Sequence, residues 1–220
     1  MNPRDQYPGV VTDLADDLSL LRDLERRLLV YKFGIEELMT KLRILSEEFD
    51  SVHRHDPIEH ITSRVKKPEG ILEKLRRKGF PLEVDRIGDH LDDIAGVRVI
   101  CPFVSDVYRV SAMLSRQHDV KILRTKDYIA SPKPNGYRSL HLIVQIPVFL
   151  SDRVEHVKVE VQLRTIAMDF WATLEHKLFY KYDDSPPADF VDELMSSAMI
   201  AAQLDDRMES LHRRIHQEDV

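Results

Sequence analysis

The stretch VEHVKVEVQLR, residues 154–164, alternates polar and apolar side chains along its whole length. A period of two is typical of a β-strand with two unlike faces. The apolar face carries Val157, Val159, Val161 and Leu163. The other face carries His156, Lys158, Glu160, Gln162 and Arg164. The pattern predicts a strand that packs on a core with one face and presents a carboxylate, an amide and cations on the other.

The segment before it predicts a second long strand, residues 137–148, joined to the first by a hairpin loop at residues 149–153. In that strand Tyr137, Ser139 and His141 share one face. Two such neighbours would build one polar floor with a tyrosine, a histidine, a carboxylate and several cations. The alternative, a plain solvent-exposed face of an antiparallel sheet, is about as frequent for a strand of this kind.

Helical and strand patterns surround this pair. Residues 13–48 carry leucine or isoleucine at intervals of three and four, which predicts one amphipathic helix or two that meet near Gly34. Residues 50–62 have no such period and predict a connecting segment. Further helices are expected after Pro68 as far as Gly79, at 105–117 with Ser105 as its cap, at 165–182 with Thr165 as its cap, and at 188–216. Further strands are expected at 97–103 and from residue 120 to 124.

This order of elements predicts an α+β fold, with a mixed β-sheet of about five strands flanked by helices. The 220 residues are enough for one hydrophobic core. We expect an N-terminal helical segment at 1–48, a central domain at 49–185, and a C-terminal helix at 186–220 that follows the break Ser185-Pro186-Pro187.

The composition indicates a cytoplasmic protein. Cys101 is the single cysteine, so no disulfide can form within the chain. The N-terminus has no pattern of a secretory leader, and the longest apolar stretch, residues 142–150, is interrupted by Gln145 and Pro147. We therefore expect no membrane association.

The charge is unevenly distributed. The formal net charge is −6, which argues against nucleic acid as a substrate. Residues 64–141 nevertheless hold 16 Lys and Arg against 10 Asp and Glu, whereas residues 183–220 hold 3 against 10. The basic middle suits a small polyanionic ligand. Neither of the glycine-rich phosphate-binding motifs, G-x-G-x-x-G and G-x-x-x-x-G-K-[ST], occurs.

Asp93 lies just before an expected apolar strand, and Glu160 lies on a strand expected nearby. Mg²⁺ is commonly held by one or two carboxylates together with substrate phosphates, so this pair predicts a magnesium site. A turn or helix-capping aspartate is an equally common use of a residue such as Asp93. Seven cations lie within residues 64–78, and the spacing of Lys74, Arg77 and Lys78 aligns them along one helix face, where they would bind phosphates. An ordinary solvated helix face is the alternative.

Four linked motifs resemble one family. They are SRVKKPEGILEKLRRKG (63–79), HLDDIAGVRVIC (90–101), LRTKDYIASPKPNGYRSLHLIV (123–144) and VEVQLRTIAMDFWATLEHKLFYKY (159–182). In this order they are similar to the nucleotidyltransferase-like synthetase domain of RelA/SpoT homologues. The chain has neither the N-terminal hydrolase domain nor the C-terminal regulatory domains of the long enzymes, so it resembles the stand-alone small alarmone synthetases.

The resemblance implies transfer of pyrophosphate from ATP to the ribose 3′-hydroxyl of GDP or GTP, with release of AMP, in the stringent response. It implies that Asp93 holds Mg²⁺ and that Glu160 orients the metal or accepts the hydroxyl proton. On the ATP side it implies that Arg64 and Arg98 stack on adenine. The implied ligands of the ATP phosphates are Lys66, Lys74 and Arg77.

On the acceptor side the resemblance implies that Tyr137 stacks on guanine beside Asn135. The implied phosphate ligands are Arg124, Lys126, Lys133 and His141, with Gln162 and Arg164 bordering the same pocket. The segment Arg124-Thr125-Lys126-Asp127 resembles the basic variant of the motif that accompanies a preference for GDP.

The family also suggests a homotetramer assembled through the terminal helices, although these helices would serve equally to cover the domain's own core. A catalytically silent regulator that binds nucleotide or RNA on the same fold is the first alternative function, and regulatory RNA is a possible partner. A nucleotidyltransferase that releases pyrophosphate is the second alternative. Identification of the leaving group as AMP or pyrophosphate separates these readings.

Overall fold

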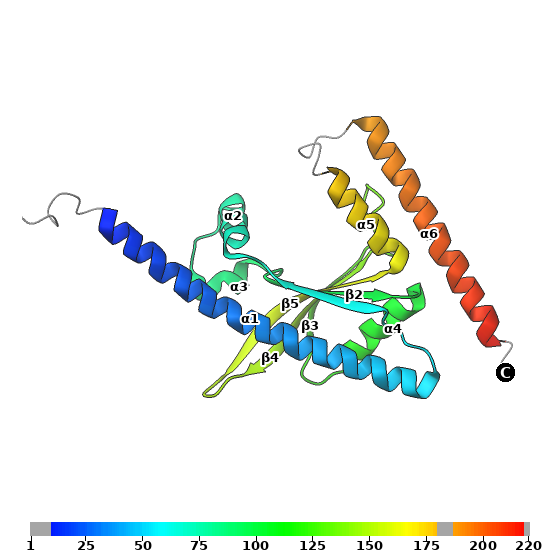
Figure 1. Cartoon of the computed structure of the whole chain (residues 1–220), viewed down its shortest axis with the longest axis horizontal. Coiled ribbons are helices and arrows are strands. Elements are labelled where there is room, and N and C mark those ends of the chain that lie inside the picture. The colour runs from blue at the N-terminus through cyan, green and yellow to red at the C-terminus, as the bar shows by residue number, and fades with distance from the viewer. Residues whose placement is uncertain (1–9, 180–186, 218–220) are drawn as a thin grey trace, which may run out of the picture.

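The computed structural model describes residues 10–179 and 187–217 (Figure 1). The helices are α1 (Val10–His53), α2 (Pro68–Lys78), α3 (Ile87–His90), α4 (Val104–Ser115), α5 (Ile166–Phe179) and α6 (Ala188–Gln217), with a 3₁₀ turn, η2, at Val84–Arg86. The strands are β1 (His60–Val65), β2 (Ala95–Cys101), β3 (Lys121–Asp127), β4 (Leu140–Phe149) and β5 (Val154–Thr165). The predicted helix end near residue 182 and most of the predicted break at 185–187 lie outside the described residues.

The five strands form one mixed sheet in the order β1-β2-β5-β4-β3. β2 and β5 are parallel, and the other neighbours are antiparallel. The predicted α+β class and mixed sheet are therefore confirmed. The prediction of a connecting segment at 50–62 is wrong in part, because β1 begins at His60. This edge strand is mostly exposed and lacks an apolar alternation, so only its backbone pairing with β2 reveals it.

Apolar side chains of the sheet pack on α1 and α4. The core includes Val157, Val159 and Val161 of β5, Leu38 of α1 and Val110 of α4, all buried. The opposite face of β5 carries the polar residues, as the alternation predicts. Figure 1 shows α1 running across the sheet and α6 beside α5 at the far end of the molecule. The polar face of the sheet is thus left free for a site.

Several local predictions need correction. α4 begins at Val104 with Phe103 at its cap position, so Ser105 is not the cap; the Ser105 N–H instead donates to Glu209 of α6 at 3.1 Å. β4 begins at Leu140, and Ser139 is buried and donates to the Leu163 carbonyl oxygen at 3.1 Å. Ser139 is therefore no part of the polar floor. The predicted cap of α5 is confirmed, because the Met168 N–H donates to Thr165 Oγ1 at 3.1 Å.

The helix α1 is continuous through Gly34, so the predicted alternative of two helices is wrong. A Cβ atom at Gly34 would lie 2.3 Å from Val157 Cγ2. Here glycine permits the close approach of α1 to β5 and does not end the helix.

We expect Gly34→Ala to lower the free energy of unfolding by about 1–3 kcal/mol, because overpacking outweighs alanine's helix propensity of about 1 kcal/mol. Gly70→Ala in α2 is the matched control. Its Cβ would lie 3.5 Å from Lys66 Cγ, which is an ordinary contact, so it should raise the free energy of unfolding by about 0.5–1 kcal/mol. Urea unfolding followed by circular dichroism measures both. Stabilisation by both variants would contradict the close approach.

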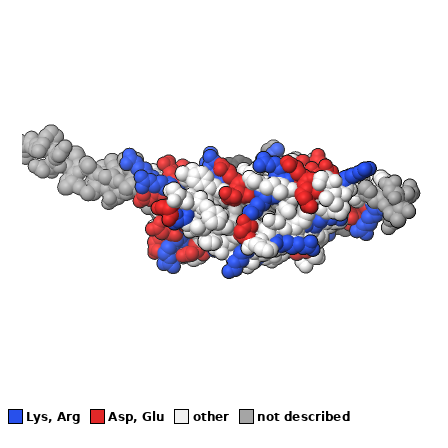
Figure 2. Space-filling model, turned by 90° about the horizontal axis from the view of Figure 1, so that it is seen from below, with Lys and Arg blue, Asp and Glu red and all other residues white. Residues whose placement is uncertain are grey.

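None of the described helices combines the length and the apolar character needed to cross a membrane. On the face shown in Figure 2, positive and negative side chains are interspersed. The basic middle of the sequence therefore does not form one continuous positive surface on that face.

Candidate active site

The strand register places two rows of residues, most of them polar, across one face of the sheet. The first row runs from Arg64 through Gly96, Glu160 and Ile143 to Arg124. The second row runs from Thr62 through Arg98, Gln162 and His141 to Lys126. Paired residues in a sheet share a face, so residues far apart in the sequence form one floor.

Two clefts open on this floor. The larger has a volume of about 470 Å³, and the smaller about 200 Å³. Asp93 and Glu160 are the two residues that line both clefts. The larger is also lined by Arg64, Arg98, Tyr137, Gln162 and Arg164, and by residues 172–177 of α5 except Leu174. The smaller is also lined by Lys74, Lys78, His90, Asp92, Arg124, Lys126, His141 and Ile143. Molecules bound in the two clefts would therefore meet at the carboxylate pair.

Two lysines hold Asp93. Lys66 Nζ donates to Asp93 Oδ2 at 2.8 Å, and Lys74 Nζ pairs with the same oxygen. Burial alone would raise the pKa of Asp93, but the hydrogen bonds and charges of the two lysines outweigh it and hold that pKa below its usual value. The carboxylate is therefore ionised at neutral pH.

Glu160 ends a chain of hydrogen bonds. Arg164 Nη2 donates to the Tyr137 hydroxyl at 2.6 Å, and this hydroxyl lies 2.7 Å from His141 Nε2. His141 Nδ1 lies 3.2 Å from Glu160 Oε1, and Gln162 Nε2 donates to Glu160 Oε2 at 3.1 Å. Because a guanidinium only donates, the chain is satisfied when the tyrosine donates to Nε2 and the Nδ1–H donates to Glu160. When the imidazole is neutral, these bonds thus hold it in one tautomer.

Burial raises the pKa of Glu160, but the hydrogen bond and charge of His141 and the hydrogen bond of Gln162 bring that pKa below its usual value. The nearby Asp93 charge opposes this shift in part. Glu160 is therefore an ionised carboxylate whose basicity depends on His141.

We expect His141→Ala to raise the pKa of Glu160. Burial raises this pKa, and His141 is the residue that lowers it most. If Glu160 must be ionised for turnover, the acid limb of the pH–rate profile should therefore move to higher pH. The ratio of variant to wild-type rate is then lower at pH 6 than at pH 8. Lys126→Ala, which changes a neighbouring cation that is not a hydrogen-bond partner of Glu160, should lower the rate without moving the limb. An equal ratio at both pH values for His141→Ala would contradict the assignment.

Asp169 of α5 joins two arginines on the floor. Arg98 Nη1 lies 3.2 Å and Arg164 Nη1 3.0 Å from Asp169 Oδ1. Burial and the neighbouring charge of Arg164 lower the pKa of Arg98, while Asp169 opposes this. The carboxylate thus permits two guanidinium groups to lie side by side, and it fixes the orientation of Arg98.

The predicted acceptor residues divide between the clefts. Arg124, Lys126 and His141 line the smaller one, whereas Tyr137, Gln162 and Arg164 line the larger. Lys133 and Asn135 line neither of the two. Lys133 Nζ lies 4.7 Å from the Tyr137 ring centroid, and Asn135 Nδ2 donates to Glu175 Oε1 at 3.0 Å. The hydrogen bond between Tyr137 and His141 spans the boundary between the clefts.

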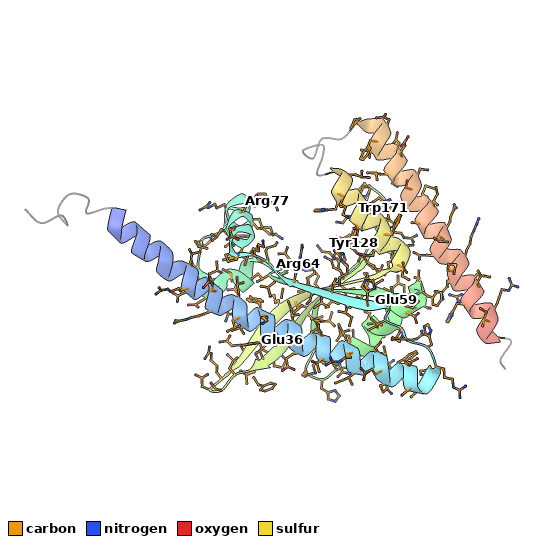
Figure 3. The ribbon with its side chains drawn as sticks, viewed as in Figure 1. Glu36, Glu59, Arg64, Arg77, Tyr128 and Trp171 are labelled. Atoms are coloured by element: carbon orange, nitrogen blue, oxygen red, sulfur yellow. The ribbon has the colours of Figure 1, made fainter. Side chains whose placement is uncertain are left out.

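The predicted ATP-side residues also differ in position. Arg64 and Arg98 line the larger cleft, and Lys74 lines the smaller. Arg77 lines a separate depression on α2 with Glu69, Leu72, Glu73 and Arg76. The structure therefore brings Lys74 and Lys78 to the site but not Arg77, and the predicted alignment of the three cations is wrong in part. Figure 3 shows Arg64 on β1 and Arg77 on α2.

Sequence reasoning missed Asp92, Asp169 and His90 as site residues, whereas it had named Lys78 as a phosphate ligand. Asp92 Oδ2 accepts from Arg124 Nη1 at 2.9 Å, and its Oδ1 accepts from Lys158 Nζ at 3.0 Å. The doublet Asp92-Asp93 was the available signal for the first. Asp169 carried no signal, because a helix pattern does not show which side chain turns toward a strand 70 residues earlier.

The donor set fits a magnesium ion. Asp93 and Glu160 are both ionised and line the same two clefts. Among the described residues no group of three or more His, Cys, Asp or Glu is arranged to hold a metal. Two carboxylates completed by phosphate oxygens and water are a usual arrangement for Mg²⁺, so the residues present are compatible with it.

Comparisons with known proteins identify the family of the chain. The family model described as the region found in RelA / SpoT proteins matches residues 63–185. GTP pyrophosphokinase YwaC of Bacillus subtilis is 49% identical over 205 residues, which cover 93% of this chain and 98% of that protein.

Solved structures are similar over most of the chain. Small alarmone synthetase 2 from Bacillus subtilis has a TM-score of 0.80 at 50% identity, covering 87% of this chain and 99% of that one. Small alarmone synthetase 1 from Bacillus subtilis, bound to its product pppGpp, has a TM-score of 0.79 at 41% identity, covering 87% and 97%. The similarity therefore includes elements outside residues 63–185.

Proposed function

The chain belongs to the RelA/SpoT family, and from this premise we propose that it is a GTP pyrophosphokinase. It transfers the β,γ-pyrophosphate of ATP to the 3′-hydroxyl of GDP or GTP and releases AMP. The observation that supports this most directly is the pair of clefts that meet at Asp93 and Glu160. A transfer between two nucleotides needs space for two bases and two phosphate chains around one reaction point, and the two clefts together offer that space.

The reaction forms one bond and breaks one. The 3′-oxygen of the acceptor bonds to the β-phosphorus of ATP, and the bond from that phosphorus to the α,β-bridging oxygen breaks. AMP leaves with the bridging oxygen, and the hydroxyl proton passes to Glu160. Such transfers depend mainly on positioning and charge neutralisation, which suits a site built from cations and two carboxylates.

We assign Arg64 and Arg98 to the adenine, with Asp169 holding Arg98 in its orientation. Lys66 and Lys74 are assigned to the ATP phosphates. Because both lysines pair with Asp93 in this structure, binding of the phosphates would exchange one anionic partner for another. Arg77 would need a different side-chain position to take part.

On the acceptor side, Tyr137 is assigned to the guanine base. The cations of the smaller cleft suit the acceptor phosphates: Arg124, Lys126 and His141, together with Lys78. Lys133 and Asn135 are assigned to the loop that holds Tyr137, and Gln162 and Arg164 to the floor beneath it.

Asp93 and Glu160 are the residues that would hold Mg²⁺. When bound, the ion neutralises charge on the transferred phosphates. In this proposal Asp93 orients the phosphates of ATP, and Glu160 accepts the proton of the acceptor's 3′-hydroxyl.

The leaving group tests the proposal. Purified protein incubated with Mg²⁺, ATP and GDP should release AMP in equal amount with ppGpp, measured by anion-exchange chromatography. Release of pyrophosphate would indicate a different nucleotidyltransferase. Nucleotide binding without either product would indicate a silent regulator.

We also propose a homotetramer that works in the cytoplasm, where both nucleotides are found. Large apolar residues follow α6 at helical spacing and are each at least 45% exposed: Ile200, Leu204, Met208, Leu211 and Ile215. A stripe of this kind is characteristic of a helix that packs on another copy.

Introducing charge into the stripe tests assembly. We expect Leu204→Asp combined with Leu211→Asp to lower the mass measured by light scattering from four chains to two or one, because a buried carboxylate would lack a partner. Gln203→Asp, on the polar side of α6, is the control and should leave the mass unchanged. A wild-type mass of fewer than four chains would contradict the proposal.

A further inference from the structure

The acceptor loop, defined here as residues 133–137, lies directly on α6. Gly136 has a φ of +87°, in the left-handed region that favours glycine. A Cβ atom at this position would lie 2.5 Å from Ala198 Cβ and 3.1 Å from Met195 Sδ. The loop backbone and the helix are thus in contact with no space for an added carbon.

The loop has little freedom of its own. The Gly136 N–H donates to the Lys133 carbonyl oxygen at 2.8 Å, and the Lys133 N–H donates to the Tyr137 carbonyl oxygen at 3.1 Å. Asn135 Oδ1 accepts from the Tyr137 N–H at 3.2 Å, while its Nδ2 reaches Glu175 of α5. A loop closed in this way moves as a unit, so its position depends on α5 and α6.

The helix α6 is fixed to the domain beside the loop. Trp171 Nε1 of α5 donates to the Leu194 carbonyl oxygen at 3.0 Å, and Thr165 Oγ1 donates to Asp205 Oδ2 at 2.8 Å. Figure 3 shows Trp171 between α5 and α6. Tyr137 packs on the cluster that Trp171 and Ala198 form with Ala172 and Leu194.

The contact between the loop and α6 is tightly packed. Small residues, Ala198, Ala201 and Ala202, face the loop, and the void that they share with Gly136, Arg138, Met168 and Trp171 measures only about 10 Å³. A leucine in place of Ala198 therefore cannot be accommodated without displacing the loop.

We propose that α6 forms the rear wall of the acceptor site, with Met195 and Ala198 as positioning residues that hold Tyr137 in place through Gly136. The proposal rests on the assignment of the loop to the guanine nucleotide. It adds to the site a helix that lies outside residues 63–185 of the family match. The same helix carries the exposed apolar stripe proposed for assembly. A shift of α6 on assembly would therefore change the position of the acceptor loop through this contact.

Steady-state kinetics of Ala198→Leu test the contact. The KM for GDP should rise about tenfold, equivalent to 1.4 kcal/mol, because Tyr137 is displaced, while the KM for ATP changes less than twofold. Met195→Ala removes the second contact without overlap and should raise the KM for GDP in the same direction by a smaller factor. Ser196→Leu adds the same side chain at an exposed position of α6 and should leave both KM values unchanged.

Trp171 supplies a readout that does not require turnover. It is the only tryptophan of the chain and lines the void beside Gly136. Addition of GDP to the wild-type protein should change its emission, and Ala198→Leu should shift the GDP midpoint by the same factor as the KM. Thermal unfolding of each variant shows whether α6 is still folded.

The outcomes separate the two proposals. If wild-type protein releases no AMP but GDP still changes the Trp171 emission with a midpoint that Ala198→Leu shifts, the function is wrong and the rear wall stands. If AMP is released but the folded variants Ala198→Leu and Met195→Ala bind GDP as the wild type does, the rear wall is wrong. An equal rise of both KM values would likewise overturn it, because that result indicates general loosening of the fold.

Discussion

Replacing Asp93 by asparagine is expected to reduce AMP release about a thousandfold or more. A metal ion contributes several kcal/mol of charge stabilisation to a phosphoryl-type transition state, and each 1.36 kcal/mol corresponds to a factor of ten in rate. Asparagine keeps the size of the side chain but is a much weaker ligand. The rate is measured with saturating Mg²⁺, ATP and GDP, so that the loss falls on kcat.

Asp92→Asn is the matched control for this experiment. Asp92 neighbours Asp93 in sequence and also pairs with two cations, but it lines only the smaller cleft. We expect its replacement to reduce the rate less than tenfold and to act on the KM for GDP, since it orients Arg124. If Asp93→Asn retained more than a tenth of the wild-type rate, the metal assignment would be wrong.

The second large effect is expected for Glu160→Gln, which should lower kcat by a factor of about 10² to 10⁴, the usual contribution of a general base. The amide oxygen can still accept from His141, so the chain from Arg164 remains largely formed. The KM values for both nucleotides should therefore stay close to those of the wild type. Anion-exchange chromatography of AMP measures the rate.

Gln162→Glu is the informative control. This change keeps the size of a side chain that lines the same cleft but replaces a donor to Glu160 by a second carboxylate. Like charges raise the pKa of one another, so the variant should lose activity at low pH and recover it as the pH rises. A kcat for Glu160→Gln within threefold of the wild type would exclude Glu160 both as the base and as a metal ligand.

Much of the fold follows from side-chain periodicity. The alternation in residues 154–164 predicts both the strand and the face that carries Glu160 and Gln162, because the pleat alone sets this direction. The helices that cover the core are also predicted from periodicity, in their case from apolar residues at intervals of three and four. The edge strand β1 is missed, because its residues HITSRV have no buried face and its existence depends on pairing with β2.

The site residues show a similar division. The motifs pointed to Asp93 and Glu160, 67 positions apart, but not to the arrangement in which these two, alone among the described residues, line both clefts. Arg77 was expected beside Lys74 from helical spacing, yet α2 presents the two side chains to different hollows. Spacing gives the angle between side chains on a helix, whereas the angle of the helix to the sheet is set by packing.

The sequence by itself determined the polar strand face, the carboxylates, the basic middle and, through four linked motifs, the family. These are properties of neighbouring residues, and short-range geometry is sufficient to predict them. The tertiary structure alone decided that the Tyr137–His141 pair bridges two clefts, that Asp169 orients Arg98, and that the acceptor loop rests on α6. The last two features join segments that are far apart in the chain, and the first depends on clefts that several such segments line. Only packing around the shared core brings these segments within contact distance.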